Sequence, residues 1–128
     1  MPYVIDASFT PTERAVIAQG ITHVEENSCV KFVPRNGDFD YLEIIPGSGG
    51  CYAQIPYWPG RGRMEVNLIQ RFALICCTFQ IGLNPSGCVY MSVVVHELLH
   101  TLGVKHEQSR PDRDDYIRIN WQNMMVSI

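Results

Sequence analysis

Two stretches of the chain repeat apolar residues at the spacing of a helix. In the first, Thr10 is followed by a proline and, three positions later, by Glu13, which is the pattern of a capped helix start. Apolar residues then continue at helical spacing, so the sequence predicts a helix over residues 11–27. The second helical pattern begins at residue 88 or 89 and ends at residue 102.

Between these two stretches the pattern is that of β-strands. Short apolar segments are separated by Gly, Pro, Asn and Asp, the residues that favour turns. The predicted strands are residues 4–5, 30–34, 39–45, 51–55 and an alternating run at 64–68. Together with the helices they predict an α+β fold, in which a twisted, mostly mixed β-sheet carries two packed helices.

Composition narrows the class of protein. The 128 residues are 46% hydrophobic and 18% charged, which is ordinary for a soluble domain and enough for one core. A formal net charge of −3 gives no reason to expect a nucleic acid or an anionic membrane as partner. No apolar run reaches the length of a membrane segment, and the first residues lack the pattern of a signal peptide.

The second helical stretch carries the residues with the clearest chemistry. His96 and His100 are four positions apart, so a helix places both imidazoles on one face. Gly103 allows the left-handed backbone that ends a helix, and the reversed chain can return His106 as a third imidazole. Because catalytic zinc sites use three protein ligands and keep a fourth position open, the spacing predicts one Zn²⁺ per chain, held by these three histidines.

Glu97 is the candidate general base. It lies about a quarter-turn around the helix from His96, too far round to be a ligand but placed to accept a proton from a metal-bound water. These residues would take these spacings by chance on the order of once in 10⁵ chains of this composition. The alternative is a core helix whose histidines make ordinary hydrogen bonds.

The motif lies within a longer family resemblance. Residues 96–114 resemble the extended signature of the astacin family, whose members carry the metzincin form of the zinc-protease motif. The likeness continues through residues 115–121 and reaches back to residues 29–35 and 47–51. It implies the upper, N-terminal subdomain of a metzincin, zinc-dependent cleavage of protein or peptide substrates, and a secreted, extracellular location.

The resemblance also implies roles for residues outside the helix. Cys51 is expected to form a disulfide with Cys88, which leaves Cys29 without its distant partner. Residues 51–54 would form the edge strand above the cleft, to which a peptide substrate adds through its backbone. Glu107 stands at the position that contacts the mature N-terminus in the family.

Two features depart from the family pattern. Residues 1–128 are expected to be part of an astacin-like peptidase domain whose C-terminal half, with its methionine turn and specificity pocket, is absent. Residues 69–84 stand where the family has only a few positions, and we interpret this apolar segment as an insertion derived from an intron in a faulty gene model. An extra helix or strand that caps the cleft is the alternative.

The function predicted for the chain is that of a zinc-dependent metalloendopeptidase. The alternative is a catalytically inactive zinc-binding chain whose metal only assists folding. His23 is expected to be a surface residue. The charged residues after the third histidine are expected to form local ion pairs that hold their loop, and they are Arg110, Asp112, Arg113, Asp114 and Asp115.

Overall fold

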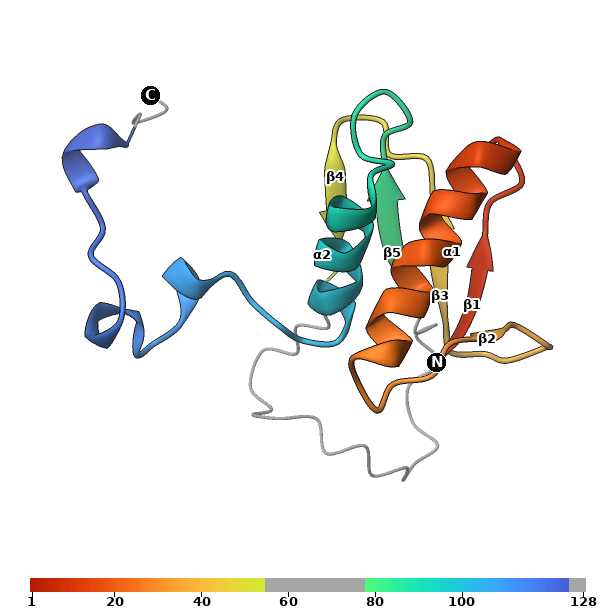
Figure 1. Cartoon of the computed structure of the whole chain (residues 1–128), viewed down its shortest axis with the longest axis horizontal. Coiled ribbons are helices and arrows are strands. Elements are labelled where there is room, and N and C mark those ends of the chain that lie inside the picture. The colour runs from red at the N-terminus through yellow and green to blue at the C-terminus, as the bar shows by residue number, and fades with distance from the viewer. Residues whose placement is uncertain (55–77, 125–128) are drawn as a thin grey trace.

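The computed structural model describes residues 1–54 and 78–124, and its body is a five-stranded sheet with two helices on one face (Figure 1). The elements of this body are β1 (Pro2–Ile5), α1 (Pro11–Glu26), β2 (Val33–Pro34), β3 (Tyr41–Ile45), β4 (Cys51–Ala53), β5 (Thr78–Leu83) and α2 (Met91–Thr101). Across the sheet the order is β2-β1-β3-β5-β4, and all neighbours are parallel except the antiparallel pair β4 and β5. The predicted α+β class, with a mixed sheet and two packed helices, is confirmed.

Helix α1 begins where the sequence predicts. The Thr10 hydroxyl accepts a hydrogen bond from the Glu13 backbone N–H at 3.3 Å, and the Glu13 carboxylate accepts one from the Thr10 backbone N–H at 2.7 Å. These reciprocal bonds satisfy amide groups that a helix start otherwise leaves without partners. The Thr10 hydroxyl and the Thr10 backbone N–H both donate to the Glu13 carboxylate at 2.7 Å, and they lower the pKa of the Glu13 carboxyl group because hydrogen bonds to the ionised form favour it.

The core forms between the helices and the middle of the sheet. Its most deeply buried side chains come from α1, β3, β5 and α2, and they are Ile17, Leu42, Ile44, Ile81, Leu83, Leu98 and Val94. The two helices approach closely at Gly20, where an added Cβ would lie 2.5 Å from Cγ1 of Val94. The absence of a side chain at Gly20 therefore sets how closely α2 packs on α1.

Strand β5 corrects our interpretation of residues 69–84. Instead of a surface insertion, residues 78–83 form a strand inside the sheet, parallel to β3 on one side and antiparallel to β4 on the other. Ile81 and Leu83 are 1% and 0% exposed. The apolar character of this part of the segment is therefore that of a core strand. Residues 69–77 and the alternating run at 64–68 lie outside the described residues.

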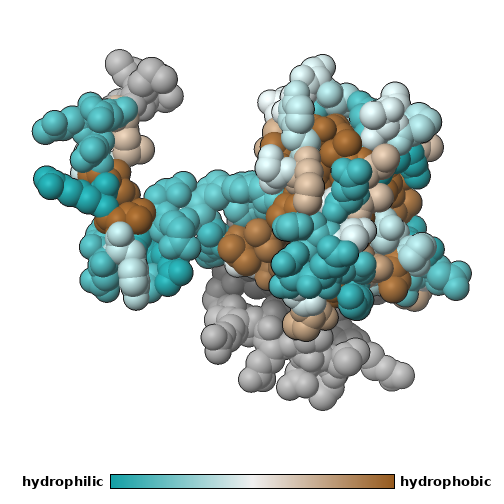
Figure 2. Space-filling model, viewed as in Figure 1, coloured by the Kyte–Doolittle hydropathy of each residue, from teal (hydrophilic) through white to brown (hydrophobic). Residues whose placement is uncertain are grey.

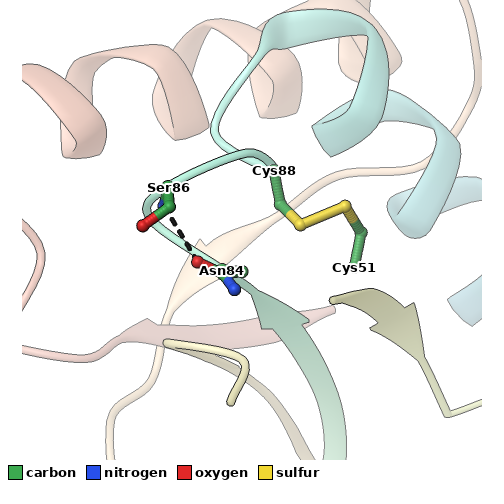
Figure 3. Close-up of a disulfide and its surroundings, with 4 residues drawn as sticks. All are labelled: Cys51, Asn84, Ser86 and Cys88. Carbon is green, nitrogen blue, oxygen red and sulfur yellow. Dashed lines mark hydrogen bonds between the residues drawn. A yellow bond between two sulfur atoms is a disulfide. The ribbon is translucent and has the colours of Figure 1, made fainter. Parts of the chain in front are cut away.

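A disulfide ties β4 to the approach of α2 (Figure 3). Cys51 and Cys88 are bonded with their Cα atoms 5.5 Å apart, as the family resemblance implied. Before Cys88 the chain turns tightly, because the amides of Gly87 and Cys88 both donate to the Asn84 carbonyl and the Ser86 amide donates to the Asn84 side chain at 2.9 Å. This turn explains why α2 begins at Met91 and not at residue 88 or 89.

After α2 the chain leaves the body of the protein. Residues 102–124 contain three short 3-10 turns and run away from the sheet and helices (Figure 1). Several apolar side chains on this segment are exposed, including Tyr116, Trp121 and Met124 at 73%, 61% and 56%. Figure 2 also shows hydrophobic residues, in brown, among hydrophilic ones along this outlying segment. None of the helices in the described part of the chain is long and apolar enough to span a membrane.

The close approach at Gly20 yields a stability prediction. Gly20→Ala should lower the free energy of unfolding by about 1–2 kcal/mol, because overpacking against Val94 outweighs the helix-forming gain of alanine. Urea unfolding monitored by circular dichroism measures the change. Gly87→Ala is the control, since a Cβ there meets open space. In a Val94→Ala background the cost of Gly20→Ala should largely disappear; an undiminished cost would contradict this contact as its cause.

The disulfide yields a second stability prediction. Replacing both Cys51 and Cys88 by alanine should lower the free energy of unfolding by about 4 kcal/mol, the loop-closure value for a sequence separation of 37 residues. Thermal unfolding of the oxidised protein measures the loss. Cys29→Ala should change little, because Cys29 is exposed and unpaired among the described residues. Equal losses from the two variants would argue against the Cys51–Cys88 pairing.

Candidate metal centre

Helix α2 presents two histidines and a glutamate in its C-terminal half. His96 is exposed, whereas His100 and Glu97 are only 9% and 5% exposed. Leu98, on the opposite side of the helix, is fully buried in the core. Burial of that apolar side therefore fixes the rotation of α2 about its axis and turns the histidines toward the cleft.

The chain reverses immediately after α2. Gly103 has φ of 90°, a left-handed conformation that only glycine adopts without strain. Its amide donates to the His100 carbonyl at 2.9 Å, and the Val104 amide donates to the Leu99 carbonyl at 3.0 Å. These bonds satisfy carbonyl groups at the helix end and direct the following residues back past α2. His106 reaches the two helical histidines in this way, as the sequence predicts.

The three imidazoles converge on one point. Nε2 of His106 lies 3.1 Å from Nε2 of His96 and 3.0 Å from Nε2 of His100. Two nitrogens bound tetrahedrally to one zinc ion at ~2.0–2.1 Å would be roughly 3.3 Å apart, so the spacing suits a single small ion. Three neutral imidazole nitrogens are also a donor set that zinc prefers. The residues present therefore fit one Zn²⁺.

A backbone contact sets the tautomer of His100. Its Nδ1 lies 2.7 Å from the carbonyl oxygen of Val104. A carbonyl oxygen can only accept, so Nδ1 carries the proton and Nε2 of the neutral ring keeps its lone pair. That lone pair points at the convergence of the three rings. The sequence analysis missed this contact, because every residue type has the same backbone carbonyl and the sequence therefore does not show which one contacts His100.

Glu97 combines burial with an unused hydrogen-bonding atom. Its Oε2 atom is buried and has no hydrogen-bond partner among the described residues. An unpaired buried carboxylate oxygen is costly, so its presence needs an explanation in terms of function. The same cleft holds the three histidines, which makes a water molecule or a substrate group the natural partner for Glu97.

The cleft in front of α2 is bordered by β4, which is an edge strand of the sheet in the described part of the chain. It has a volume of about 380 Å³, and its lining comes from β4, α2 and the segment after Gly103. The lining residues are Cys51, Tyr52, Ala53, His96, Glu97, His100, Lys105, His106 and Ser109. Lys105 and Ser109 were not singled out in the sequence analysis, because no motif distinguishes them from ordinary surface residues.

The charged residues beyond His106 pair with one another. Arg110 contacts Asp112 at 2.7 Å and Glu107 at 3.5 Å, while Arg113 contacts Asp114 at 3.2 Å. The hydrogen bond from Arg110 lowers the pKa of the Asp112 carboxyl group, and Asp112 raises the pKa of Arg110 in turn. The predicted ion pairs are confirmed for Arg110, Asp112, Arg113 and Asp114.

Glu107 does not meet the N-terminus of this chain. It pairs with Arg110, while the α-amino group of Met1 donates to the carbonyl oxygen of Lys31. His23 lies exposed on α1, as expected for a surface residue.

Comparison with known proteins decides the family. The family model for astacin, a family of peptidases, matches residues 1–128. The chain belongs to the astacin family. Zinc metalloproteinase nas-6 of Caenorhabditis elegans is 35% identical over 127 residues, which cover 98% of this chain and 31% of that protein. High choriolytic enzyme 2 of Oryzias latipes is also 35% identical, over 98% of this chain and 38% of that protein.

A solved astacin structure shares the fold. High choriolytic enzyme 1, a hatching enzyme zinc-protease from the medaka fish Oryzias latipes, matches with a TM-score of 0.76 at 32% sequence identity. The match covers 98% of this chain and 54% of that chain. The astacin chain described here thus spans about half of the solved relative and about a third of the two curated relatives.

The geometry yields a metal-binding prediction. The refolded chain should bind close to one zinc ion, and His100→Ala should weaken binding by orders of magnitude because it removes one of three ligands. Competition with a chelating dye measures the affinity. His23→Ala is the matched control, since His23 lies on α1 away from the other histidines. Equal weakening by both changes would contradict the assignment.

Proposed function

We propose that this chain carries the zinc-binding half of a metalloendopeptidase active site. The observation that supports the proposal best is the convergence of His96, His100 and His106 beside Glu97, whose buried Oε2 atom has no hydrogen-bond partner among the described residues. Three neutral ligands and one acid that is not a ligand are the elements of a hydrolytic zinc site. Membership of the astacin family supports the same reaction.

The proposed chemistry divides between metal and protein. Bound zinc would polarise the scissile carbonyl and lower the pKa of a water molecule to about 7. His96, His100 and His106 hold the ion, and the Val104 carbonyl keeps Nδ1 of His100 protonated so that Nε2 is available. Glu97 accepts the proton of the attacking water and then delivers it to the leaving amine.

The substrate in this proposal is an extended segment of protein or peptide. Among the described strands, β4 lies at the edge of the sheet and borders the cleft, so an added strand can pair with its outer backbone groups. Backbone pairing holds any sequence in an extended form, which suits an endopeptidase. The Cys51–Cys88 disulfide fixes this edge next to the start of α2.

The disulfide also bears on location. Disulfides persist in oxidising compartments, so we place the protein outside the cell, in keeping with a secreted protease. Its partners are then extracellular protein or peptide substrates. The net charge of −3 offers no general attraction to nucleic acid.

A catalytically inactive zinc-binding chain is the second candidate. His96 and His106 are exposed, so water would surround much of the metal and weaken the electrostatic stabilisation of a transition state. The described residues supply one wall of the cleft, from β4 and α2. The solved relative is nearly twice as long, so the part of that protein without a match here can contribute further walls.

A chimaera separates these two candidates. The 128 residues alone should show little proteolysis, whereas the same residues joined to the unmatched C-terminal part of high choriolytic enzyme 1 should cleave casein when zinc is present. In the chimaera, Glu97→Gln should reduce turnover by about 10²–10⁴-fold, the usual contribution of a general base, and leave the zinc content unchanged.

The controls make the outcome decisive. Asp115→Asn, a change in an exposed residue outside the cleft lining, should leave the turnover of the chimaera unchanged. A chimaera that binds zinc but does not cleave protein would favour the inactive zinc-binding chain. Strong cleavage by the 128 residues alone, lost in Glu97→Gln, would instead refute the inactive candidate.

A further inference from the structure

Tyr52 makes an unusual cross-strand contact beside the cleft. In the antiparallel pair of β4 and β5, Tyr52 lies opposite Gly82. A Cβ atom added at Gly82 would overlap the Tyr52 ring, so the ring occupies the space where a side chain of β5 would stand. Tyr52 as a whole nevertheless remains 41% exposed.

The alternation of side chains shows which face of the sheet carries this ring. Cys51 is bonded to Cys88 before α2, and Ala53 packs against the core, so both point to the helical face. Tyr52 lies between them in the strand and therefore points to the opposite, outer face. On that face β5 contributes Gly82 and Gln80, whose side-chain amide donates to the Glu43 carboxylate of β3 at 2.9 Å.

The hydrogen-bond ladder shows which backbone groups of β4 remain available. The Gln54 amide donates to the Gln80 carbonyl, so the next bonded pair along the ladder, two residues away, is Tyr52 with Gly82. The backbone groups of Cys51 and Ala53 consequently point away from β5, toward the side of β4 on which no other described strand pairs. A peptide that adds to β4 bonds to these two residues.

This arrangement places one peptide side chain next to Tyr52. The peptide residue between the two bonded positions lies directly opposite Tyr52 as a non-hydrogen-bonded pair, in which Cβ atoms are about 4.5–5.5 Å apart. Its side chain shares the outer face with the Tyr52 ring. Aromatic and β-branched side chains gain most from such a pair.

We propose that Tyr52 is a specificity-determining residue that favours an aromatic or β-branched substrate side chain at the position opposite it, and that Gly82 is the positioning residue that seats its ring. The inference rests on the proposed function, because it needs a peptide on β4. Gly82 acts through Tyr52 only: it leaves room for the ring to lie on β5, so that the ring is already ordered before a peptide arrives.

Peptide binding tests the proposal in the zinc-loaded chain. Four blocked peptides of six residues are compared, all serine except for a central Phe, Val, Ser or Asp, in a Glu97→Gln background that prevents turnover. NMR titration should give dissociation constants about two- to fivefold lower for the Phe and Val peptides than for the Ser and Asp peptides. Tyr52→Phe should keep this preference, and Tyr52→Ser should abolish it.

Gly82→Ala tests whether the open space at Gly82 positions the Tyr52 ring. It should remove most of the preference although Tyr52 is still present, whereas Gly49→Ala should not, since a Cβ at Gly49 meets open space. If Gly82→Ala fails to fold, the Tyr52 variants decide the question alone.

Loss of affinity for all four peptides alike in Tyr52→Ser would indicate a purely structural role and overturn the proposal. A zinc-loaded Glu97→Gln chain that binds no peptide contradicts the proposed function as well, whereas one that binds all four alike contradicts only the role of Tyr52.

Discussion

The candidate metal centre depends on the reversal of the chain at the end of α2. A helix can bring two histidines to one face, but a third nitrogen at the same point must come from a segment that turns back. Gly103, with φ of 90°, allows this turn, and the amides of Gly103 and Val104 satisfy the carbonyl groups of the last helical turn. The same turn places the Val104 carbonyl against Nδ1 of His100. One local backbone conformation thus sets both the position of the His106 imidazole and the tautomer of His100.

The rest of the fold holds α2 in place so that this turn borders a cleft. Gly20 lets α1 approach the helix, and β5 supplies Ile81 and Leu83 to the core beneath it. The disulfide between Cys51 and Cys88 joins the helix approach to the edge strand β4. Buried apolar surface therefore orients the helix, while a covalent bond fixes the distance from the histidines to the strand edge. Packing and crosslink together define the space in which a peptide would lie.

The parts of the structure that local chemistry determines could be predicted from the sequence. The capping pattern at Thr10 and Glu13 predicted the start of α1, and the spacing of three histidines around Gly103 predicted that their imidazoles lie together. Strand β5 could not be predicted in the same way. Within β5 the buried Ile81 and Leu83 alternate with Gln80 and Gly82, but the strand directly follows the continuous apolar sequence of residues 72–77, and its place in the sheet is set by distant partners. The contact of the Val104 carbonyl was hidden for another reason, since any residue type supplies the same backbone oxygen.

X-ray absorption spectroscopy of the zinc-loaded chain tests the central claim most directly, because it reports the atoms bound to the ion. Our account predicts three imidazole nitrogens at ~2.0–2.1 Å and an oxygen ligand in the open position. The three cysteines outside the Cys51–Cys88 disulfide provide the obvious competing donor set. A sulfur ligand at ~2.3 Å, or a shell containing fewer than three imidazoles, would contradict the convergence of His96, His100 and His106 on one zinc ion.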